Sequence, residues 1–224
     1  MTLKILADLA QGTDEWRAAR CGMVTASVVG QLLTPTRRIA DNDTSRGCTY
    51  TLAAERITGY PELGYMGADM WRGVEDEPRA RDCYAEHHAP VEEVGFMIRD
   101  DWGFPIGYSP DGLVGDAGQI EIKSRLPKIH LKAILEDRVP ADVMPQLQCG
   151  LLVSGRAWVD YVSFCGGMPL WVKRVTPDPD WHAAIVAAIE AFEENVSLAI
   201  ASYRTATVGL PLTERAPEYA EMEL

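Results

Sequence analysis

The stretch Ser109–Arg125, SPDGLVGDAGQIEIKSR, restricts the fold more than any other part of the sequence. Its segment QIEIK alternates polar and apolar residues, which is the period of a β-strand. A strand-like segment precedes it, and the small residues of Gly115–Gly118 supply the turn that a hairpin needs. Such a hairpin brings Asp111 next to Glu121. Because successive side chains on a strand point to opposite faces, Glu121 and Lys123 share one face and the two isoleucines face the core.

Two carboxylates and an ammonium group that converge on one point predict a metal site. Carboxylates are ligands for hard divalent cations, and Mg²⁺ is typically bound by one or two carboxylates together with phosphate oxygens. Glu-x-Lys on a strand, taken alone, is better explained as a salt bridge on an ordinary surface hairpin. The whole set, in which Pro-Asp and a hairpin precede Glu-x-Lys between two isoleucines, favours the metal site.

The composition is that of a globular domain with a strongly acidic charge. With 224 residues, 47% hydrophobic and 24% charged, the chain is long enough for one substantial domain, which we expect to span residues 1–224. A net charge of −12 argues against a generic nucleic-acid coat, which is basic, but permits an enzyme with a local basic groove. Sixteen of the 21 cationic residues are arginine, which suits bidentate phosphate contacts.

Neither the cysteines nor the apolar runs indicate a secreted or membrane protein. The five cysteines are scattered and odd in number, and none forms C-x-x-C, which argues against a disulfide framework and a zinc site. No run of eighteen apolar residues predicts a transmembrane helix. The first residues lack the apolar core and cleavage site of a signal peptide. We therefore expect a cytoplasmic protein with no membrane partner.

The periodicity of the sequence predicts a mixed α/β fold. We expect helices at residues 14–21, 25–33, 49–58, 68–88, 128–137, 143–153 and 181–203. We expect strands at residues 93–98, 105–109, 111–114, 119–123, 157–164 and 169–175. This order indicates an α/β (α+β) fold with one central mixed sheet flanked by helices. Residues 35–46 read as an exposed loop, and about 205–224 as an acidic, loosely held tail.

Two further polar side chains are candidates for the same site. Glu77 precedes Pro78, and because proline fits best in the first turn of a helix, we expect the helix at 68–88 to be interrupted near 73–78. Glu77 is then free to point away from the core. In MPQLQCGLLV, Gln146 and Gln148 lie two residues apart, so at most one points into a site. The alternative for both is a pair of partly buried amides.

Arg20 and Ser27 flank a turn near the N-terminus that opens an expected helix. Backbone N–H groups at a helix N-terminus, with a serine and an arginine nearby, form a natural phosphate site. Read alone, Ser27 is better explained as a helix cap.

Four blocks follow one another between Gln11 and about Val153: QGTDEWRAARCGMVTAS, RGVEDEP, SPDGLV with IEIKSR, and PQLQ. In this order they resemble the phage lambda exonuclease and YqaJ-like viral recombinase family, within the PD-(D/E)XK nuclease superfamily. The resemblance implies a restriction-endonuclease-like core. After about residue 154 the chain is similar to the family only in its strand–strand–helix pattern.

The resemblance implies a Mg²⁺-dependent, two-metal nuclease in which Mn²⁺ can substitute. It would digest linear double-stranded DNA from 5′ to 3′, release mononucleotides and leave 3′ single strands for recombination. The implied metal ligands are Asp111, Glu121, the Ile122 carbonyl and Glu77. Lys123 would orient or deprotonate the attacking water. Gln146 would steady that lysine, the water or the scissile phosphate.

The resemblance also implies how the enzyme recognises a DNA end. The positions that match the family's receptor for the 5′-phosphate are Arg20, Ser27 and Ser109. A further basic residue after the Glu-x-Lys strand serves the same purpose in the family, and here the alternatives are Arg125, Lys128 and Lys132. From its charge alone, we expect the loop with Arg37 and Arg38 to lie beside the DNA. Family members can form a ring-shaped trimer and work with a single-strand annealing protein.

Two other functions remain open at this stage. An endonuclease of the same superfamily would have the same core site, but it would not need a pocket for a 5′-phosphate. A catalytically inactive module that binds DNA ends would not need to keep Asp111, Glu121 and Lys123 together. The exonuclease is therefore the function that the sequence favours.

Overall fold

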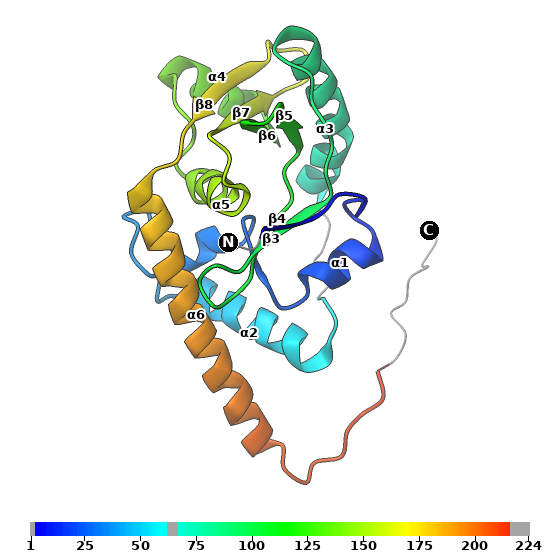
Figure 1. Cartoon of the computed structure of the whole chain (residues 1–224), viewed down its shortest axis with the longest axis vertical. Helices are drawn as coiled ribbons and strands as arrows, with labels where there is room; N and C mark the ends of the chain where they lie inside the picture. The colour runs from blue at the N-terminus through cyan, green and yellow to red at the C-terminus, as the bar shows by residue number, and fades with distance from the viewer. Residues whose placement is uncertain (1–2, 62–66, 216–224) are drawn as a thin grey trace.

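The strands form two mixed sheets in the computed structural model, which describes residues 3–61 and 67–215 (Figure 1). The first sheet has the order β1–β3–β4–β2, with strands β1 (Leu3–Leu6), β2 (Val24–Thr25), β3 (Phe96–Arg99) and β4 (Ile106–Tyr108). The second has the order β5–β6–β7–β8, with strands β5 (Gly112–Val114), β6 (Gly118–Ser124), β7 (Trp158–Phe164) and β8 (Trp171–Val175). In each sheet a parallel pair, β2 with β4 or β6 with β7, lies beside antiparallel pairs. The mixed α/β class is confirmed, and the strands form two sheets where the sequence led us to expect one.

The chain passes from the first sheet to the second through Ser109–Asp111. β4 ends at Tyr108 and β5 begins at Gly112. Pro110 lies between them and has no N–H to donate to a sheet ladder, so continuous pairing is not favoured there. Asp111 therefore lies at the junction of the two sheets, directly before the first strand of the hairpin.

Six α-helices accompany the sheets in the described residues. They are α1 (Asp14–Arg20), α2 (Asp43–Thr58), α3 (Ala68–His87), α4 (Pro127–Glu136), α5 (Met144–Ser154) and α6 (Pro179–Ala206), and a 3₁₀-helix, η1, spans Val29–Leu32. α5 is mostly buried because it packs against β3 and β4 of the first sheet and against β7 of the second. α3 packs on β6 and β7, and α2 lies along α6 (Figure 1). α5 thus links the two sheets.

The helix α3 corrects one expectation about the site. It runs without interruption from Ala68 to His87 and contains Pro78, so Glu77 lies inside the helix and not at the start of a new one. Proline costs about 3 kcal/mol in a helix interior. The burial of Ala80 and Tyr84 against the second sheet offsets this cost. Tertiary packing therefore overrides the local preference for a break.

The segment after α1 also differs from the expected helix at 25–33. Val24 and Thr25 pair with β4 instead, and only the 3₁₀-helix η1 follows. The expected loop at 35–46 is shorter than predicted because α2 begins at Asp43. Asn42 and Ser45 form a capping box there, and this places Arg46 in the first turn of α2.

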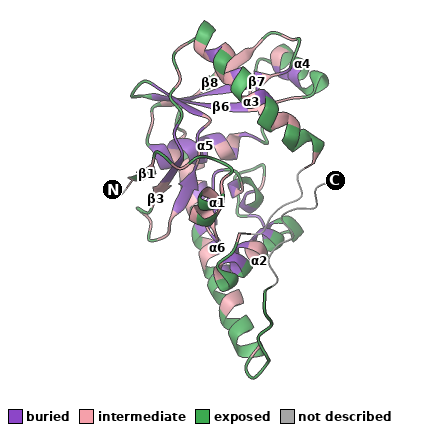
Figure 2. Ribbon diagram, turned by 90° about the vertical axis from the view of Figure 1, so that its right-hand side faces the viewer, coloured by how far each residue is buried: buried purple, intermediate pink, exposed green. Residues whose placement is uncertain are grey.

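Buried residues are concentrated in the strands of both sheets and in α5 (Figure 2). The larger hydrophobic cluster joins the first sheet to α2, α5 and α6, and a smaller one lies between α3 and the second sheet. α6 extends to Ala206, so the expected tail begins after this helix, and its residues 216–224 lie outside the described part. The five cysteines carry free thiols. Among the described helices, none combines the length and apolar character needed to cross a membrane.

Candidate active site

The predicted hairpin is present and brings Asp111 to the strand that carries Glu121. β5 pairs antiparallel with β6, with Gly112 opposite Ile120. The carboxylate of Asp111 accepts a hydrogen bond from the backbone N–H of Ile122 at 2.6 Å. Gly112 is required here, since a Cβ atom at this position would lie 2.1 Å from a methyl carbon of Val91. Asp111 is thereby fixed beside the middle of β6.

Glu121 is the centre of a buried polar cluster. Its side chain is only 2% exposed, and Lys123 Nζ lies 2.9 Å from Glu121 Oε1. Gln146 Nε2, on the first turn of α5, donates to the same oxygen. The hydroxyl of Tyr108 donates to the other oxygen at 3.3 Å. The shared face of Glu121 and Lys123 is confirmed.

The two glutamines of α5 divide as their spacing predicts. Gln146 points to Glu121. Gln148 points elsewhere: it donates to the carbonyl of Thr176 and accepts from the N–H of Asp178. One of the two amides therefore belongs to the site, and the other joins α5 to the start of α6.

Glu77 reaches the same cluster from α3. Its carboxylate accepts a hydrogen bond from Arg81 one turn further along the helix, at 2.5 Å. Arg81 also donates to the backbone carbonyl of Asp111 at 2.8 Å, which ties α3 to the junction of the sheets. The structure thus gathers Glu77, Asp111 and Glu121 from three separate elements.

The carboxylates of this cluster repel one another. Burial raises the pKa of Asp111 well above its ordinary value, and the charges of Glu121 and Glu77 raise it further. Burial also raises the pKa of Glu77; Arg81 opposes this rise, and Glu121 adds to it. Buried carboxylates in mutual repulsion gain stability from a bound cation. Their electrostatics therefore favour occupation of the cluster by a positive charge.

Lys123 supplies part of that positive charge. Burial alone would lower the pKa of Lys123, but the carboxylates of Glu121 and Asp111 together outweigh burial and raise that pKa. Tyr108 stays protonated at neutral pH, because burial and the neighbouring Glu121 raise its pKa well above the ordinary value. The hydroxyl of Tyr108 is therefore a permanent hydrogen-bond donor to Glu121.

The donor set fits a hard divalent cation, since Asp111, Glu121 and Glu77 offer carboxylate oxygens. Within residues 3–61 and 67–215, no group of three carboxylate, imidazole or thiol side chains is arranged so that it could hold a metal ion. The carboxylate oxygens instead bind protein donors, among them Lys123 and the Ile122 N–H. To bind a cation, the carboxylates would have to exchange some of these partners.

The three predicted phosphate residues also lie together. Arg20 Nη2 donates to Ser27 Oγ at 3.1 Å and to Thr25 Oγ1 at 3.2 Å. The guanidinium of Arg20 stacks on the ring of Trp16, 3.8 Å from its centroid. The indole N–H of Trp16 donates to Ser109 Oγ at 2.9 Å. This group, the Arg20 cluster, therefore comprises Arg20, Ser27, Thr25, Trp16 and Ser109.

The Arg20 cluster is joined to the carboxylates through the chain itself. Ser109 precedes Asp111 by two residues, and Gln11 donates to the carbonyl of Pro110 between them. Burial lowers the pKa of Arg20 to about 10, while Glu55 opposes this change, so the guanidinium remains charged at neutral pH. Ser27 accepts from Arg20, and the N-cap position of η1 belongs to Val28. The reading of Ser27 as a helix cap is therefore wrong.

The remaining predicted cations differ in their surroundings. Arg37 lies 3.5 Å from Asp178 and 3.6 Å from Asp180, at the start of α6. Arg38 is exposed on the same loop. These contacts hold Arg37 in ion pairs, and no geometry in the described residues brings either arginine to the carboxylate cluster.

Of the three alternatives after β6, Arg125 lies beside the site. Arg125 Nε donates to the hydroxyl of Tyr161 at 3.2 Å, and its charge opposes the rise that Glu121 and Asp111 cause in the pKa of Lys123. Lys128 is exposed on α4, and Lys132 lies 3.9 Å from Glu136 on the same helix. Which of the three contacts the 5′-phosphate stays a prediction.

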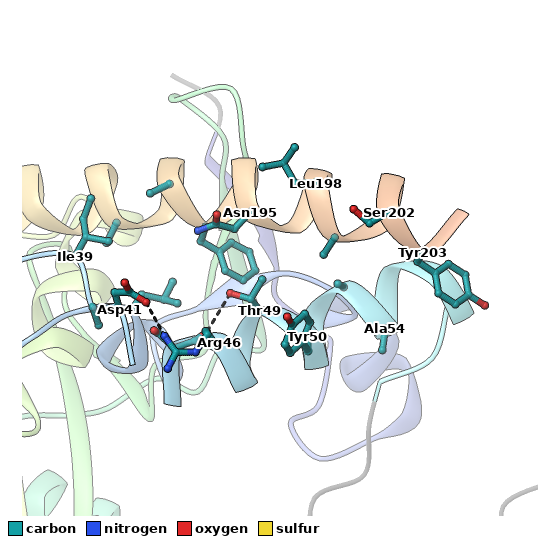
Figure 3. Close-up of a pocket in the computed structure, with 18 of the residues that line it drawn as sticks. Ile39, Asp41, Arg46, Thr49, Tyr50, Ala54, Asn195, Leu198, Ser202 and Tyr203 are labelled. Atoms are coloured by element: carbon teal, nitrogen blue, oxygen red, sulfur yellow. Dashed lines mark hydrogen bonds and ion pairs between the residues drawn. The ribbon is translucent and has the colours of Figure 1, made fainter. Parts of the chain in front are cut away.

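A groove of about 900 Å³ between α2 and α6 lies apart from this chemistry (Figure 3). Its lining is mainly apolar and includes Ile39, Tyr50 and Leu198. The carboxylate of Asp41 in its wall pairs with Arg46 at 2.6 Å. None of the clustered carboxylates lines this groove, so we assign the chemistry to the cluster around Glu121.

The family profile of the YqaJ-like viral recombinase domain matches residues 15–157. This range is more than half of the chain and contains both the Arg20 cluster and the carboxylate cluster. The chain belongs to the YqaJ-like viral recombinase family. A comparison with curated protein sequences found no match.

Solved structures agree with this membership of the YqaJ-like family. An alkaline exonuclease (LHK-Exo) from Laribacter hongkongensis is 32% identical, with a TM-score of 0.79 over 89% of this chain and 100% of that one. The same values hold for LHK-Exo in complex with dAMP. A phage related exonuclease from Haemophilus somnus 129PT has the same fold, with 12% identity and a TM-score of 0.62 over 81% of this chain and 96% of that one. The YqaJ-family protein is thus similar to exonucleases, which supports a nuclease.

Proposed function

We propose that this YqaJ-family protein is a Mg²⁺-dependent exodeoxyribonuclease that digests linear double-stranded DNA from 5′ to 3′. It releases mononucleotides and leaves 3′ single strands for recombination. The observation that carries the proposal is the direct connection between the Arg20 cluster and the carboxylate cluster, through Ser109–Asp111. A DNA end bound by its 5′-phosphate at the first cluster presents its first phosphodiester to the second.

Binding of the cation is proposed for Asp111, Glu121, Glu77 and the carbonyl of Ile122. When bound, Mg²⁺ offsets charge on the transferring phosphate and makes hydroxide available near neutral pH. The mutual repulsion of Asp111 and Glu77 supports this assignment, because a cation relieves it. Mn²⁺, which accepts similar oxygen ligands, is expected to substitute.

Lys123 is proposed to orient or deprotonate the attacking water. Because its pKa is raised, the resting side chain is a charged hydrogen-bond donor that orients the water, and to deprotonate the water it would first have to give its own proton to solvent. In the structure, Lys123 Nζ is held 2.9 Å from Glu121 Oε1, so its position is fixed by a proposed metal ligand. Gln146 donates to the same oxygen and steadies both groups. Tyr108 keeps Glu121 in place from the buried side. These residues together hold Lys123 and the proposed metal ligand Glu121 in one geometry.

The products that we propose agree with the chemistry of a known ligand of a relative. LHK-Exo was crystallised in complex with dAMP. A deoxynucleoside monophosphate is the unit that a 5′-to-3′ exonuclease releases at each step. We propose duplex DNA ends as the partner of the YqaJ-family protein. The ring-shaped trimer and the annealing protein stay predictions, which light scattering and pull-down with a phage annealing protein can test.

The proposal is tested with three substrates at saturating Mg²⁺. They are linear duplex with 5′-phosphate ends, the same duplex with 5′-hydroxyl ends, and closed circular duplex. We expect fast digestion of the first, slow digestion of the second and none of the third. Cleavage of the circle at a rate similar to the linear duplex would favour the endonuclease. Binding of ends without hydrolysis would favour the inactive end-binding module.

A further inference from the structure

Arg81 is a largely buried arginine that the proposed reaction does not yet use. Its side chain is 14% exposed, on the face of α3 that carries Glu77. Arg81 Nη2 lies 2.5 Å from Glu77 Oε1, Nε donates to the carbonyl of Asp111 at 2.8 Å, and Nη1 lies 3.0 Å from Glu93 Oε2. One guanidinium thus contacts two proposed metal ligands and an acid on the segment before β3.

These contacts hold Asp111 from both ends. Its backbone carbonyl accepts from Arg81, and its carboxylate accepts from the N–H of Ile122 at 2.6 Å. The same guanidinium fixes the carboxylate of Glu77 on α3. Because α3 and the β4–β5 junction are distant in sequence, a rigid planar donor between them fixes the spacing of the two ligands.

We infer that Arg81 is a positioning residue that sets the separation of Glu77 and Asp111 for binding of a divalent cation. The inference rests on the proposed function, since it assumes that these two carboxylates bind the metal. It assigns Arg81 no contact with DNA or with the reacting phosphate. Arg79 on the same helix provides the contrast, because its side chain is 67% exposed and it pairs with Asp76 at 3.2 Å.

The charge of Arg81 and its geometry have opposite effects on cation binding. A positive charge beside the site repels a cation, so removing the charge alone would tighten binding. The directional hydrogen bonds hold the ligands in place, so losing them weakens binding. Residues that orient metal ligands typically contribute about 10–100-fold to metal affinity or activity. Two substitutions separate these effects. Lysine keeps the positive charge but lacks the planar guanidinium with its several N–H donors, and glutamine removes the charge.

The experiment measures Mn²⁺ binding to the full chain by isothermal titration calorimetry without DNA. If Arg81 positions the ligands, Arg81→Lys binds Mn²⁺ roughly tenfold or more weakly than the wild type. Arg81→Gln is then weakened less than Arg81→Lys, because it also loses the charge that repels the cation. If Arg81 acts through its charge alone, Arg81→Lys binds like the wild type and Arg81→Gln binds more tightly, which would overturn the inference. The matched controls Arg79→Lys and Arg79→Gln are expected to keep wild-type affinity.

Two further measurements make the result decisive. Asp111→Ala tests the proposed metal site itself: if it keeps wild-type Mn²⁺ affinity, the proposed function fails, whatever Arg81 does. If Asp111→Ala loses binding and the Arg81 variants do not, only the inference about Arg81 fails. The rate of Arg81→Lys is then measured against metal concentration. A deficit that shrinks as Mn²⁺ rises supports positioning, and a deficit that excess Mn²⁺ leaves unchanged indicates substrate contact and contradicts it.

Discussion

Arg20→Ala should slow digestion of 5′-phosphorylated linear duplex roughly 10–100-fold. A hydrogen bond to a charged group contributes about 1.5–3 kcal/mol, and each 1.36 kcal/mol changes a rate about tenfold. Arg20 is already held by Ser27 and Thr25 and stacked on Trp16. Its side chain therefore loses little further conformational entropy when it binds a phosphate, and the full free energy of the hydrogen bond contributes to the rate. A 5′-hydroxyl end carries no terminal phosphate for Arg20 to contact. The substitution should therefore change little in the slower digestion of the 5′-hydroxyl duplex.

The assay compares initial rates on one duplex prepared with 5′-phosphate and with 5′-hydroxyl ends. Arg17→Ala is the matched control, because Arg17 lies on the same helix and pairs with exposed Asp14 at 2.7 Å. This control should keep the wild-type preference for phosphate. If Arg20→Ala slows both substrates equally, or neither, then Arg20 does not recognise the 5′-phosphate and the reasoning is refuted.

Three other variants test the remaining parts of the account. Asp111→Asn should abolish hydrolysis, and in metal-free buffer at pH 7 to 8 it should raise Tm. The expected rise in Tm follows from the raised pKa of Asp111. As pH rises above the pKa of the unfolded state, the buried carboxyl costs stability, whereas the asparagine amide cannot ionise. An unchanged or lower Tm would contradict this prediction. Lys123→Ala should lower kcat severely with DNA affinity largely kept, and poor binding with normal turnover of bound DNA would make Lys123 a phosphate anchor. Each phosphate contact contributes ~0.9 to the slope of log K for DNA binding against log salt. Replacing Arg37 and Arg38 together should lower this slope by nearer ~0.9 than ~1.8, since Arg37 already pairs with Asp178. An unchanged slope would mean that this loop does not contact DNA.

The β5–β6 hairpin and the glutamine of α5 were predictable from the sequence, because they depend on patterns within a few neighbouring residues. Alternation on β6 fixed the shared face of Glu121 and Lys123, and the small residues of the turn predicted the hairpin that returns Asp111. The spacing of the two glutamines on α5 likewise limited the site to one of them, and that one is Gln146. The proximity of Arg20, Ser27 and Ser109 came from the family resemblance.

The missed residues act across long separations in the chain. Trp16 contacts Ser109, and Arg81 contacts Asp111, through elements that meet only after folding. Aromatic and arginine residues in helices have many ordinary uses, so no local pattern distinguishes these two. α3 was predicted with a break because the penalty of Pro78 is local, whereas the packing that overrides it is not. The division into two sheets likewise depends on pairing between distant strands.

The central claim is that the carboxylate cluster hydrolyses DNA stepwise from a 5′ end held by the Arg20 cluster. The most direct measurement follows a linear duplex that carries different labels in its 5′-terminal and 3′-terminal nucleotides of one strand, at saturating Mg²⁺. The account predicts that the 5′ label appears first, as a mononucleotide, while the 3′ label of the same strand remains in DNA. It also predicts no release of either label by Asp111→Asn. Release of the 3′ label first, or of the 5′ label as an oligonucleotide, would contradict the account.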